Sequence, residues 1–458
     1  MSNKETVHAW LEAHQGELIQ AMQESVAFAS VKGEAAPNAP FGREIRGCLD
    51  HALGLAGRMG FATKDLDGYA GCVDYGSGEE LVGVLAHLDV VPEGTGWTYP
   101  PFGGELHDGK LYGRGVLDDK GPAIITLFSL KAIQEAGLPM KRRVRLILGC
   151  DEECGMGCLD HYCKVEEIPT MSFSPDAEYP LVNSEKNSFN AEYGCAYLST
   201  VTMKAGERHN VVPGECDATV ALPLSAIPAY AREGYTLTAT AMDESHTKLH
   251  MVGLSSHASL PEQGRNAVCA MLELLSALPL SEADARVVKT LWKALGLEVH
   301  GETLGLDKTD ASGRLSLCAG GVVRWDEKGL SRFSIDIRAP ISVGEEEIYS
   351  ALNGAFNPGG LTDSEHGFSQ GYCIPRDSEL VTKLLGVYGK YSGQNAEPLA
   401  IGGGTYARHL PNAVAFGPEI PGHAANIHMP DEYITLEDIM FNVHMIAEAI
   451  MELACDLS

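Results

Sequence analysis

The chain has 458 residues, of which 45% are hydrophobic and 21% are charged, a balance typical of globular proteins. This length exceeds what a single hydrophobic core usually serves, so we expect two domains or three. The formal net charge of -28 argues against a nucleic-acid binder, which normally carries a basic face, and against docking on anionic membranes. We therefore expect neither nucleic acid nor a membrane as a partner.

The N-terminal segment, residues 1–22, has the pattern of an amphipathic helix and lacks the apolar centre of a signal peptide. No later stretch approaches the ~20 apolar residues that span a bilayer. These features predict a cytoplasmic protein.

Residues 1–185 alternate between strand and helix patterns. Residues 80–91 form a near-continuous apolar run, which is typical of a strand buried on both faces of a sheet. Residues 120–136 are predicted to form a helix, and residues 143–149 and 170–174 two further strands. Strand, helix and strand in this order indicate an α/β layered domain.

The pattern changes after about residue 186. Alternating strand patterns and interspersed helical stretches then indicate an inserted α+β unit. The strands are expected at 191–203, 218–222, 236–241 and 332–337, and the helices at 266–278 and 283–295. From residue 377 the chain returns to helix, Gly-rich loop, strand and a closing helix at 436–453, which we expect to rejoin the first domain. The predicted domains are 1–186 with 374–458, and 187–373.

Four of the twelve cysteines crowd one segment: Cys150, Cys154, Cys158 and Cys163. Spacings of four put the first three on roughly one helical face, if the segment is helical throughout. A structural zinc site is conceivable, but the usual paired spacing of zinc cysteines is missing. The alternative, small buried apolar side chains in a reducing compartment, is the commoner role of free cysteine.

The triplet His87-Leu88-Asp89 is the first candidate for metal chemistry. Side chains two apart on a strand share a face, so Asp89 can reach the His87 ring and fix its tautomer. This arrangement commonly surrounds a metal-bound histidine. The triplet alone is a weak signal, as short motifs generally are.

A second candidate is the segment Y-G-R-G-V-L-D-D-K-G at residues 112–121. Its glycines permit close approach of the backbone to a site. The pair Asp118-Asp119 opens the predicted helix, so a helix cap is the simplest explanation. A cap does not explain why two glycines, Arg114 and Lys120 surround the pair.

Acidic residues also follow two predicted strands. Residues 151–153 are three adjacent acids after the strand 143–149, and Asp176 follows the next strand. Adjacent acids repel one another, so a cation is expected there, although a solvated loop is the usual reading of an acidic run. His428, with His423 nearby as a competitor, completes a set of histidines and carboxylates that suits two divalent ions such as Zn²⁺.

Together these segments resemble one metallopeptidase family. The motifs are H-L-D, Y-G-R-G-V-L-D-D-K-G, D-E-E, S-P-D-A-E and H-M-P-D-E, and further matches are N-V-V-P, G-L-S-S-H-A-S, I-R-A-P and G-G-G-T-Y-A-R. The family includes aminoacylase, glutamate carboxypeptidase and succinyl-diaminopimelate desuccinylase, and the likeness is greatest to its PepV-type dipeptidases. The resemblance implies a mixed-sheet α/β catalytic domain of phosphorylase/hydrolase type with helices on both faces, plus an inserted α+β lid.

The resemblance also implies roles for individual residues. The metal ligands would be His87, Asp118, Asp176, Glu153 and His428, with the first three on one metal, the last two on the other, and Asp118 bridging. Glu152 would be the general base, Asp89 would orient His87, and the peptide bond from Asp118 to Asp119 would be cis. The metals would be two divalent ions, Zn²⁺ in first place, with Mn²⁺ or Co²⁺ also compatible.

Residues of the inserted domain would bind the substrate. The resemblance implies that His257 stabilises the oxyanion and that Arg338 binds the substrate carboxylate, for which a guanidinium fork is well suited. Asn210, Gly403, Gly404 and Thr405 would hold the same end of the substrate. The simpler alternatives are a structural His257 in a Ser-rich turn and a surface ion pair for Arg338.

The implied activity is metal-dependent hydrolysis of short peptides that have a free N-terminus, by water activated at two metals. The alternatives are an N-acyl amino acid amidohydrolase of the same family, a non-catalytic binding protein that keeps the fold, and a cysteine-based redox protein. The long inserted segment favours a monomer over a dimer, because a lid of the PepV type closes over its own site.

Overall fold

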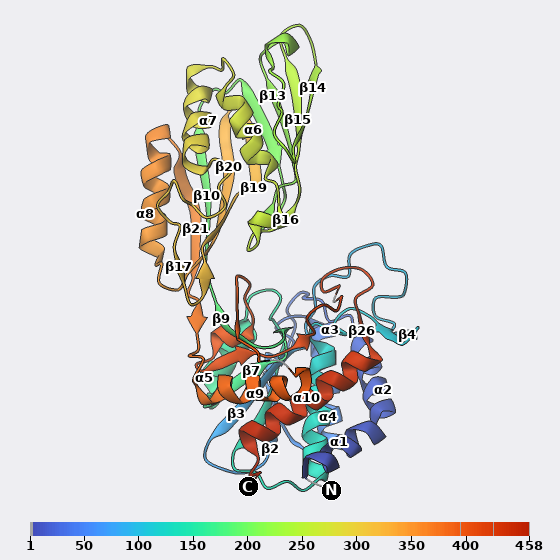
Figure 1. The fold of residues 1–458 in the computed structure, drawn as a ribbon. Coiled ribbons are helices and arrows are strands. Elements are labelled where there is room, and N and C mark those ends of the chain that lie inside the picture. The colour runs from blue at the N-terminus through green and yellow to red at the C-terminus, as the bar shows by residue number, and fades with distance from the viewer. Residues whose placement is uncertain (1–2, 394, 425, 458) are drawn as a thin grey trace. The chain divides into compact units, whose positions relative to one another are not determined.

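The computed structural model describes residues 3–393, 395–424 and 426–457 and divides the chain into two compact units (Figure 1). Unit 1 takes Met1–Asn183, Ile374–Leu399 and Gly404–Ser458, and unit 2 takes Ser184–Cys373 and Ala400–Gly403. The main division lies close to the bounds derived from the sequence. The short return of residues 400–403 to unit 2 was not anticipated.

A mixed sheet forms the centre of unit 1. In unit 1 its strands follow the order β1-β2-β6-β3-β7-β24-β9, in which β3 runs parallel to β6 and β7, and β24 runs parallel to β7. All residues of β3 are buried, as expected for a central strand covered on both faces. The strands are β1 (Ala62–Leu66), β2 (Ala70–Tyr75), β6 (Arg143–Gly149), β3 (Leu81–His87), β7 (Met171–Ser174), β24 (Ala413–Ala415) and β9 (Val182–Glu185).

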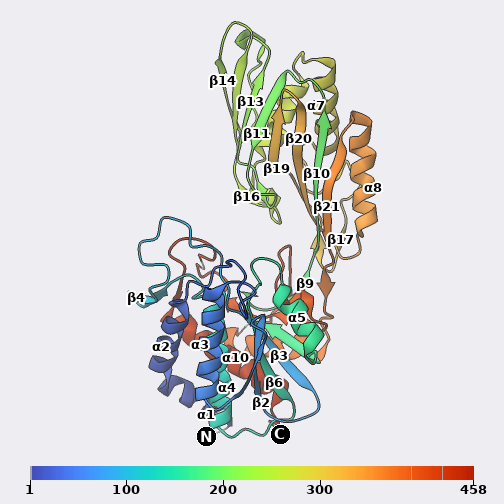
Figure 2. The ribbon, with the colours of Figure 1, turned by 180° about the vertical axis from the view of Figure 1, so that it is seen from behind.

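Helices cover both faces of this sheet, which confirms the predicted fold class. A Cβ on Gly71 of β2 would lie 2.9 Å from a methyl carbon of Leu49 in α3, and the Arg145 guanidinium of β6 lies 3.4 Å from the Tyr162 hydroxyl of α5. Leu148 of β6 is the register partner of Gly71, so these two residues share a face of the sheet. Arg145 lies three residues before Leu148 and therefore points to the opposite face. Figure 2 shows α3 and α5 on either side of these strands. The helices of unit 1 are α1 (Asn3–Ala13), α2 (Gln15–Val26), α3 (Arg43–Arg58), α4 (Lys120–Glu135), α5 (Gly157–Val165), α9 (Glu379–Ser392) and α10 (Leu436–Ala454).

Unit 2 is built on an eight-stranded antiparallel sheet with the order β14-β15-β13-β11-β19-β20-β10-β21. The strands are β10 (Asn187–Ala196), β11 (Val201–Ala205), β13 (Glu215–Val220), β14 (Thr236–Ala241), β15 (Thr247–Val252), β19 (Ser316–Asp326), β20 (Gly329–Ala339) and β21 (Thr362–Ser369). The helices are α6 (Ala267–Ser276), α7 (Glu282–Leu295) and α8 (Glu345–Phe356).

The strand β20 shows how this sheet divides its faces. Phe333, Ile335 and Ile337 belong to the apolar core, which also contains residues of α6, α7 and α8 (Figure 1). Side chains alternate along a strand, so Asp336 and Arg338 lie on the other face. The sequence pattern thus places a predicted substrate residue on the face that the helices leave open.

Three elements differ from the sequence prediction. The strand expected at 80–91 ends at His87, because the chain turns into a loop there. The strand expected at 191–203 is divided into β10 and β11 by a turn. The N-terminal helix is likewise divided into α1 and α2 at His14.

The four crowded cysteines do not share a helical face. The helix α5 begins at Gly157, so Cys150 and Cys154 precede it. Cys150 and Cys158 are buried, whereas Cys154 and Cys163 are exposed. In the part of the chain that the structure describes, no cysteine belongs to a group of side chains that could hold a metal ion.

None of the helices in the described ranges is both long enough and apolar enough to span a membrane.

A buried carboxylate of unit 2 leads to a prediction about stability. Asp284 of α7 accepts hydrogen bonds from the Ser199 hydroxyl (2.6 Å), the Thr200 amide (3.0 Å) and the Ser281 hydroxyl (2.7 Å). Burial alone would raise the pKa of Asp284, but these hydrogen bonds outweigh it and lower the pKa. Since the folded pKa lies below the unfolded value of about 3.9, the stabilisation is complete above that pH and is lost as the pH falls through the folded pKa.

Asp284→Asn is therefore expected to lower the free energy of unfolding of unit 2 by about 2 kcal/mol at neutral pH. Urea unfolding, followed by hydrogen exchange of the α7 amides, measures the difference between the variant and the wild type. The difference should shrink as the pH falls below the unfolded-state value of about 3.9 and through the lowered pKa of the folded Asp284 carboxyl. A difference that is independent of pH would contradict this assignment.

Candidate metal centre

Acidic side chains and a histidine meet where three strands of the unit 1 sheet end. His87 is the last residue of β3, Glu152 and Glu153 follow β6, and Asp176 follows β7. The ends lie at one edge of the sheet, because β3 is parallel to both neighbours and His87 is in register with Gly149. The topology therefore brings together three predicted ligands, His87, Glu153 and Asp176, and the predicted base, Glu152.

Two loops add Asp118 and His428. Asp118 lies just before α4, and its peptide bond to Asp119 is cis, as the resemblance implied. Asp118 Oδ1 lies 3.0 Å from His87 Nε2, and Asp118 Oδ2 lies 3.0 Å from His428 Nε2. The two oxygens of one carboxylate thus face two different histidines, which is the arrangement that a bridge between two metal ions requires.

The potential ligand atoms form two groups that share His87. Within each group these atoms lie within 4.8 Å of one another. The groups are His87, Glu152 and Asp176, and His87, Asp118 and Glu153. His428 joins the second group through its Nε2, which lies 3.0 Å from Glu153 Oε1.

The imidazole of His87 tests whether these residues fit a metal. Its Nδ1 lies 2.9 Å from the carbonyl oxygen of Asp89, which can only accept, so Nδ1 carries the proton. In the neutral ring, Nε2 then presents a lone pair, and this buried atom faces a carboxylate oxygen of Asp118 at 3.0 Å, which cannot donate to it. Imidazole nitrogen and carboxylate oxygens are suitable ligands for Zn²⁺, Mn²⁺ or Co²⁺. The donor set therefore fits divalent metal ions.

The pKa shifts of the clustered side chains also favour a bound cation. Burial raises the pKa of Glu152 to about 8, and the carboxylates of Asp118 and Glu153 add to the shift. Burial and Asp118 hold the pKa of Asp176 well above its usual value. Hydrogen bonds to Asp118 and Glu153 raise the pKa of the half-exposed His428 to about 10. In the absence of metal, protons must therefore balance the crowded carboxylates.

Asp89 supports the cluster in a different way from the one predicted. The His87 ring bonds to the Asp89 carbonyl oxygen, and the nearer carboxylate oxygen lies 3.6 Å from Nδ1. The reason is that Asp89 lies in the loop after β3 and not on the strand. Its carboxylate accepts the backbone N–H groups of Glu152 and Glu153, each at 3.1 Å. Asp89 therefore also fixes the segment that carries both glutamates.

Two alternatives from the sequence can now be compared with the geometry. His423 Nδ1 lies 2.9 Å from Asp438 Oδ1, whereas His428 contacts the carboxylate cluster. Asp119 makes no side-chain cap bond at the start of α4, so the helix-cap explanation is wrong. Its carboxylate instead accepts the backbone N–H of His87 at 3.0 Å.

Comparison with known proteins identifies the family. Residues 83–452 match the family described as Peptidase family M20/M25/M40. The chain belongs to this peptidase family. "Putative dipeptidase YtjP" of Bacillus subtilis (strain 168) is 36% identical over 456 residues, which cover 96% of this chain and 97% of that protein. "Putative dipeptidase SH1171" of Staphylococcus haemolyticus is 30% identical, over 97% of this chain and 99% of that protein.

Solved structures agree on the fold. Human carnosine dipeptidase 1 is 16% identical with a TM-score of 0.56, over 99% of each chain. The di-peptidase Dug1p from Saccharomyces cerevisiae is 14% identical with a TM-score of 0.57, also over 99% of each chain. The predicted family and peptidase activity are thus confirmed, and the M20 assignment implies divalent metal ions. The finer likeness to the PepV type stays a prediction.

Unit 2 of this M20 peptidase carries His257 and Asn210. His257 lies in the short strand β16 (Ser256–His257), which pairs with β12 (Val211–Val212). The next residue, Ala258, donates its backbone N–H to the carbonyl oxygen of Asn210 at 2.9 Å, and His257 Nδ1 lies 2.7 Å from Ser259 Oγ. The structure thus brings these two predicted substrate residues to one short ladder.

Arg338 lines a cavity of about 550 Å³ in unit 2, together with Asn210 and Asp336. The Arg338 Nε and Nη2 atoms donate to the Asp336 carboxylate at 2.9 and 3.0 Å, and Nη1 donates to the carbonyl oxygen of Gly402 at 3.1 Å. Asp336 is buried, so this is not the surface ion pair considered as the alternative. These three hydrogen bonds hold the guanidinium at the wall of the cavity.

The Gly-rich loop crosses the division between the units. Gly402 and Gly403 belong to unit 2, whereas Gly404 and Thr405 belong to unit 1. A Cβ at Gly402 would lie 2.6 Å from the Ser259 side chain, so only glycine fits there. The Thr405 hydroxyl accepts the N–H of Ala407 at 3.2 Å and caps the short helix η4 (Tyr406–His409). Its contribution to substrate binding stays a prediction.

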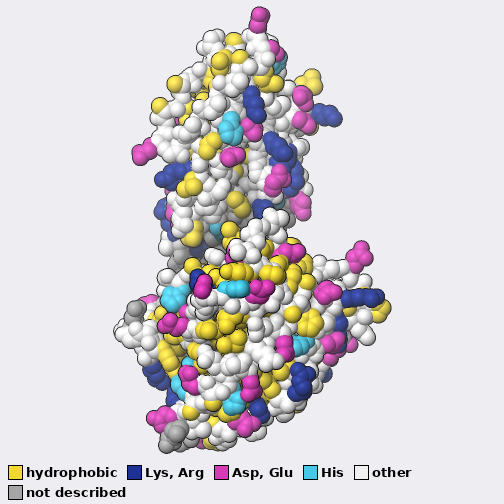
Figure 3. All heavy atoms as spheres, turned by 90° about the vertical axis from the view of Figure 1, so that its right-hand side faces the viewer, with side chains coloured by type: hydrophobic (Ala, Val, Ile, Leu, Met, Phe, Trp, Pro, Cys, Tyr) yellow, Lys and Arg dark blue, Asp and Glu magenta, His cyan; other side chains and the backbone are white. Residues whose placement is uncertain are grey.

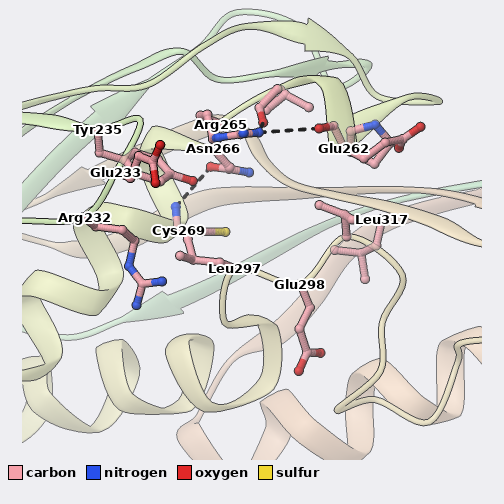
Figure 4. Close-up of a pocket in the computed structure, with 14 residues that line it drawn as sticks. Arg232, Glu233, Tyr235, Glu262, Arg265, Asn266, Cys269, Leu297, Glu298 and Leu317 are labelled. Atoms are coloured by element: carbon pink, nitrogen blue, oxygen red, sulfur yellow. Dashed lines mark hydrogen bonds between the residues drawn. The ribbon is translucent and has the colours of Figure 1, made fainter.

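A second cavity of unit 2, of about 430 Å³, is shown in Figure 4. Charged side chains such as Arg232, Arg265 and Glu298 stand beside Tyr235 and Leu317 in its wall. None of the predicted site residues is among the described residues that line it. Of these two cavities, only the one at Arg338 is lined by predicted site residues among those described.

The sequence offered no role for the two cations beside Asp118. Lys120 is buried, and its Nζ donates to the carbonyl oxygens of Val26 (3.2 Å) and Phe28 (2.8 Å). Arg114 is also buried and pairs with Glu432 at 2.6 Å. A charged side chain inside a loop of glycines and apolar residues was the signal that could have indicated such buried partners.

Proposed function

We propose that this M20 peptidase is a dipeptidase that binds two divalent ions, Zn²⁺ in first place, and hydrolyses short peptides with a free N-terminus. The observation that carries the proposal is the Asp118 carboxylate, whose oxygens each lie 3.0 Å from a different histidine, His87 and His428. The two full-length relatives at 36% and 30% identity, both named as dipeptidases, support the substrate class.

Bound at this site, two divalent ions would lower the pKa of a water molecule from about 15.7 towards 7. Glu152, in the donor group with His87 and Asp176, accepts the proton of that water and returns it to the leaving amine. Positive charge beside Glu152 favours its carboxylate form, so its pKa falls below the metal-free value when the site is loaded. The base is then ready at neutral pH.

Residues of unit 2 hold and polarise the substrate in this proposal. The His257 imidazole stabilises the oxyanion that develops from the peptide carbonyl. Asn210 and Arg338 hold the C-terminal carboxylate, with the glycines and Thr405 of the 402–405 loop at the same end. In support of this, Asn210 and Arg338 line one polar cavity and Asp336 fixes the orientation of the guanidinium.

Arg338→Lys is expected to raise KM for dipeptides about 10- to 100-fold, with a smaller change in kcat. Lysine keeps the charge but loses the planar fork that binds a carboxylate through two hydrogen bonds. Arg332→Lys is the matched control, because Arg332 lies on the same strand and lines the same cavity but pairs with Glu192. Steady-state kinetics measure both variants, and an unchanged KM in Arg338→Lys would argue against the carboxylate role.

The alternative is an N-acyl amino acid amidohydrolase, because the same metal chemistry cleaves both kinds of amide. Purified, metal-loaded protein should be incubated with dipeptides, tripeptides and N-acyl amino acids. We expect cleavage of dipeptides, and weaker or no cleavage of the N-acylated compounds. Cleavage of the N-acylated compounds alone would replace the dipeptidase assignment by the alternative.

We also propose a cytoplasmic monomer that binds neither nucleic acid nor membranes. The net charge of -28 supports the absence of nucleic-acid and membrane binding. On the face seen in Figure 3, acidic and basic side chains lie intermixed. Light scattering after size-exclusion chromatography tests the oligomeric state. The mass expected for one chain is 49.0 kDa, and twice that mass would indicate a dimer.

A further inference from the structure

A buried glutamate connects the loops that carry Asp118 and His428. Glu432 has 0% of its surface exposed. Its Oε1 accepts the backbone N–H groups of Gly115 (3.0 Å), Leu117 (3.1 Å) and Asp118 itself (3.3 Å). Its Oε2 accepts the Arg114 guanidinium at 2.6 Å. Both oxygens are thus committed to the loop of residues 113–118.

These contacts separate Glu432 from the metal ligands. It belongs to neither donor group, although it stands only four residues after His428. The loop between them is fixed at a second point, because Asp431 accepts the backbone N–H of Thr98 at 2.8 Å. The backbone adds a further bond, from Gly113 N–H to the carbonyl oxygen of Glu432 at 3.0 Å. The two acids after His428 therefore anchor its loop.

We propose that Glu432 is a positioning residue that holds Asp118 and His428 at the distance at which one carboxylate can serve two metals. A bond to the Asp118 amide fixes the point from which that side chain extends. Glu432 itself lies on the His428 loop, so a displacement of either loop breaks the hydrogen bonds that join the two loops. The inference rests on the proposed two-metal function and assigns Glu432 no contact with substrate or metal.

A purely structural role for the Arg114–Glu432 pair makes a different prediction. Breaking a buried ion pair destabilises a protein wherever the pair lies, because one charge is left without its partner. Such a loss lowers the melting temperature of the metal-free protein but leaves the metal sites of the folded fraction unchanged. A residue that orients ligands instead changes metal affinity, typically by about 10- to 100-fold.

The experiment compares Glu432→Gln with Glu166→Gln in the full-length protein. Glu166 is the matched control, because its partly buried carboxylate pairs with Arg145 at 2.8 Å and lies in neither donor group. Zn²⁺ is titrated in competition with a chromophoric chelator, and the melting temperature of the metal-free protein is measured alongside. We expect the weaker Zn²⁺ site to lose about 10- to 100-fold in affinity in Glu432→Gln and to be unchanged in Glu166→Gln.

A second variant covers the case in which Glu432→Gln does not fold. Replacing Arg114 and Glu432 together by glutamine removes both charges, which is less damaging than removing one. The same loss of Zn²⁺ affinity is expected there. Unchanged affinity in the folded variant, with a lowered melting temperature, would overturn the proposal. The wild-type titration separates this from failure of the two-metal function, since that function requires two bound Zn²⁺ ions in the unaltered protein.

Discussion

Glu152→Gln is expected to lower kcat for dipeptide hydrolysis by at least about 10²-fold while both metal ions stay bound. Glutamine keeps the size of the side chain but cannot accept a proton from water. Glu152 shares a donor group with His87 and Asp176, so its carboxylate lies beside the proposed metal site. Metal content by mass spectrometry, measured with steady-state kinetics on the same sample, tests both parts of the prediction.

The neighbouring glutamate is the matched control. Glu152 and Glu153 have equivalent backbone support, since each donates its N–H to Asp89 at 3.1 Å. Glu153, however, lies 3.0 Å from His428 Nε2, as a ligand of the second metal should. Glu153→Gln is therefore expected to lose bound metal as well as activity. Equal metal loss in the two variants, or full turnover in Glu152→Gln, would contradict the division between base and ligand.

Asp118→Asn should be more damaging than the loss of any ligand that serves one metal. Asp118 is the carboxylate that faces both His87 and His428. An amide offers one oxygen and no charge, so both sites weaken together. Since metal ions supply several kcal/mol of transition-state stabilisation, we expect kcat/KM to fall about 10³-fold and metal content to fall below one ion per chain.

Asp151→Asn controls for the removal of one acid near the cluster. Asp151 belongs to the acidic run that contains Glu152 and Glu153. It pairs with Lys32 at 2.6 Å, however, and lies in neither donor group. It should retain two metal ions per chain. If Asp118→Asn also retains both ions with unchanged affinity, then Asp118 does not bridge them.

Much of the fold could be predicted because the apolar patterns are regular. The strands 143–149 and 236–241 were predicted with their observed bounds, since short apolar or alternating runs end at clear breaks. The end of β3 at His87 could not be predicted, because the apolar run continues through Leu88 and Val90, which are buried in the loop. Apolar residues that are buried in a loop give the same sequence pattern as apolar residues that are buried in a strand.

The sequence predicted the candidate ligands of the site better than the residues that hold those ligands in place. Residues directly after buried strands, such as Glu153 and Asp176, can be placed at the sheet edge from the chain order alone. The partner of Arg114 lies 318 residues away along the chain, and no local pattern indicates such a pairing. The Asp89 carboxylate likewise meets Glu152 and Glu153 only because β3 and β6 are neighbours.

The most direct test is to titrate Zn²⁺ into chelator-stripped protein while the hydrolysis of a dipeptide is followed. We expect no turnover without metal and a rise in activity that saturates at two Zn²⁺ ions per chain. Full turnover of the metal-free protein, or saturation at a single ion, would contradict a centre in which Asp118 joins two metals.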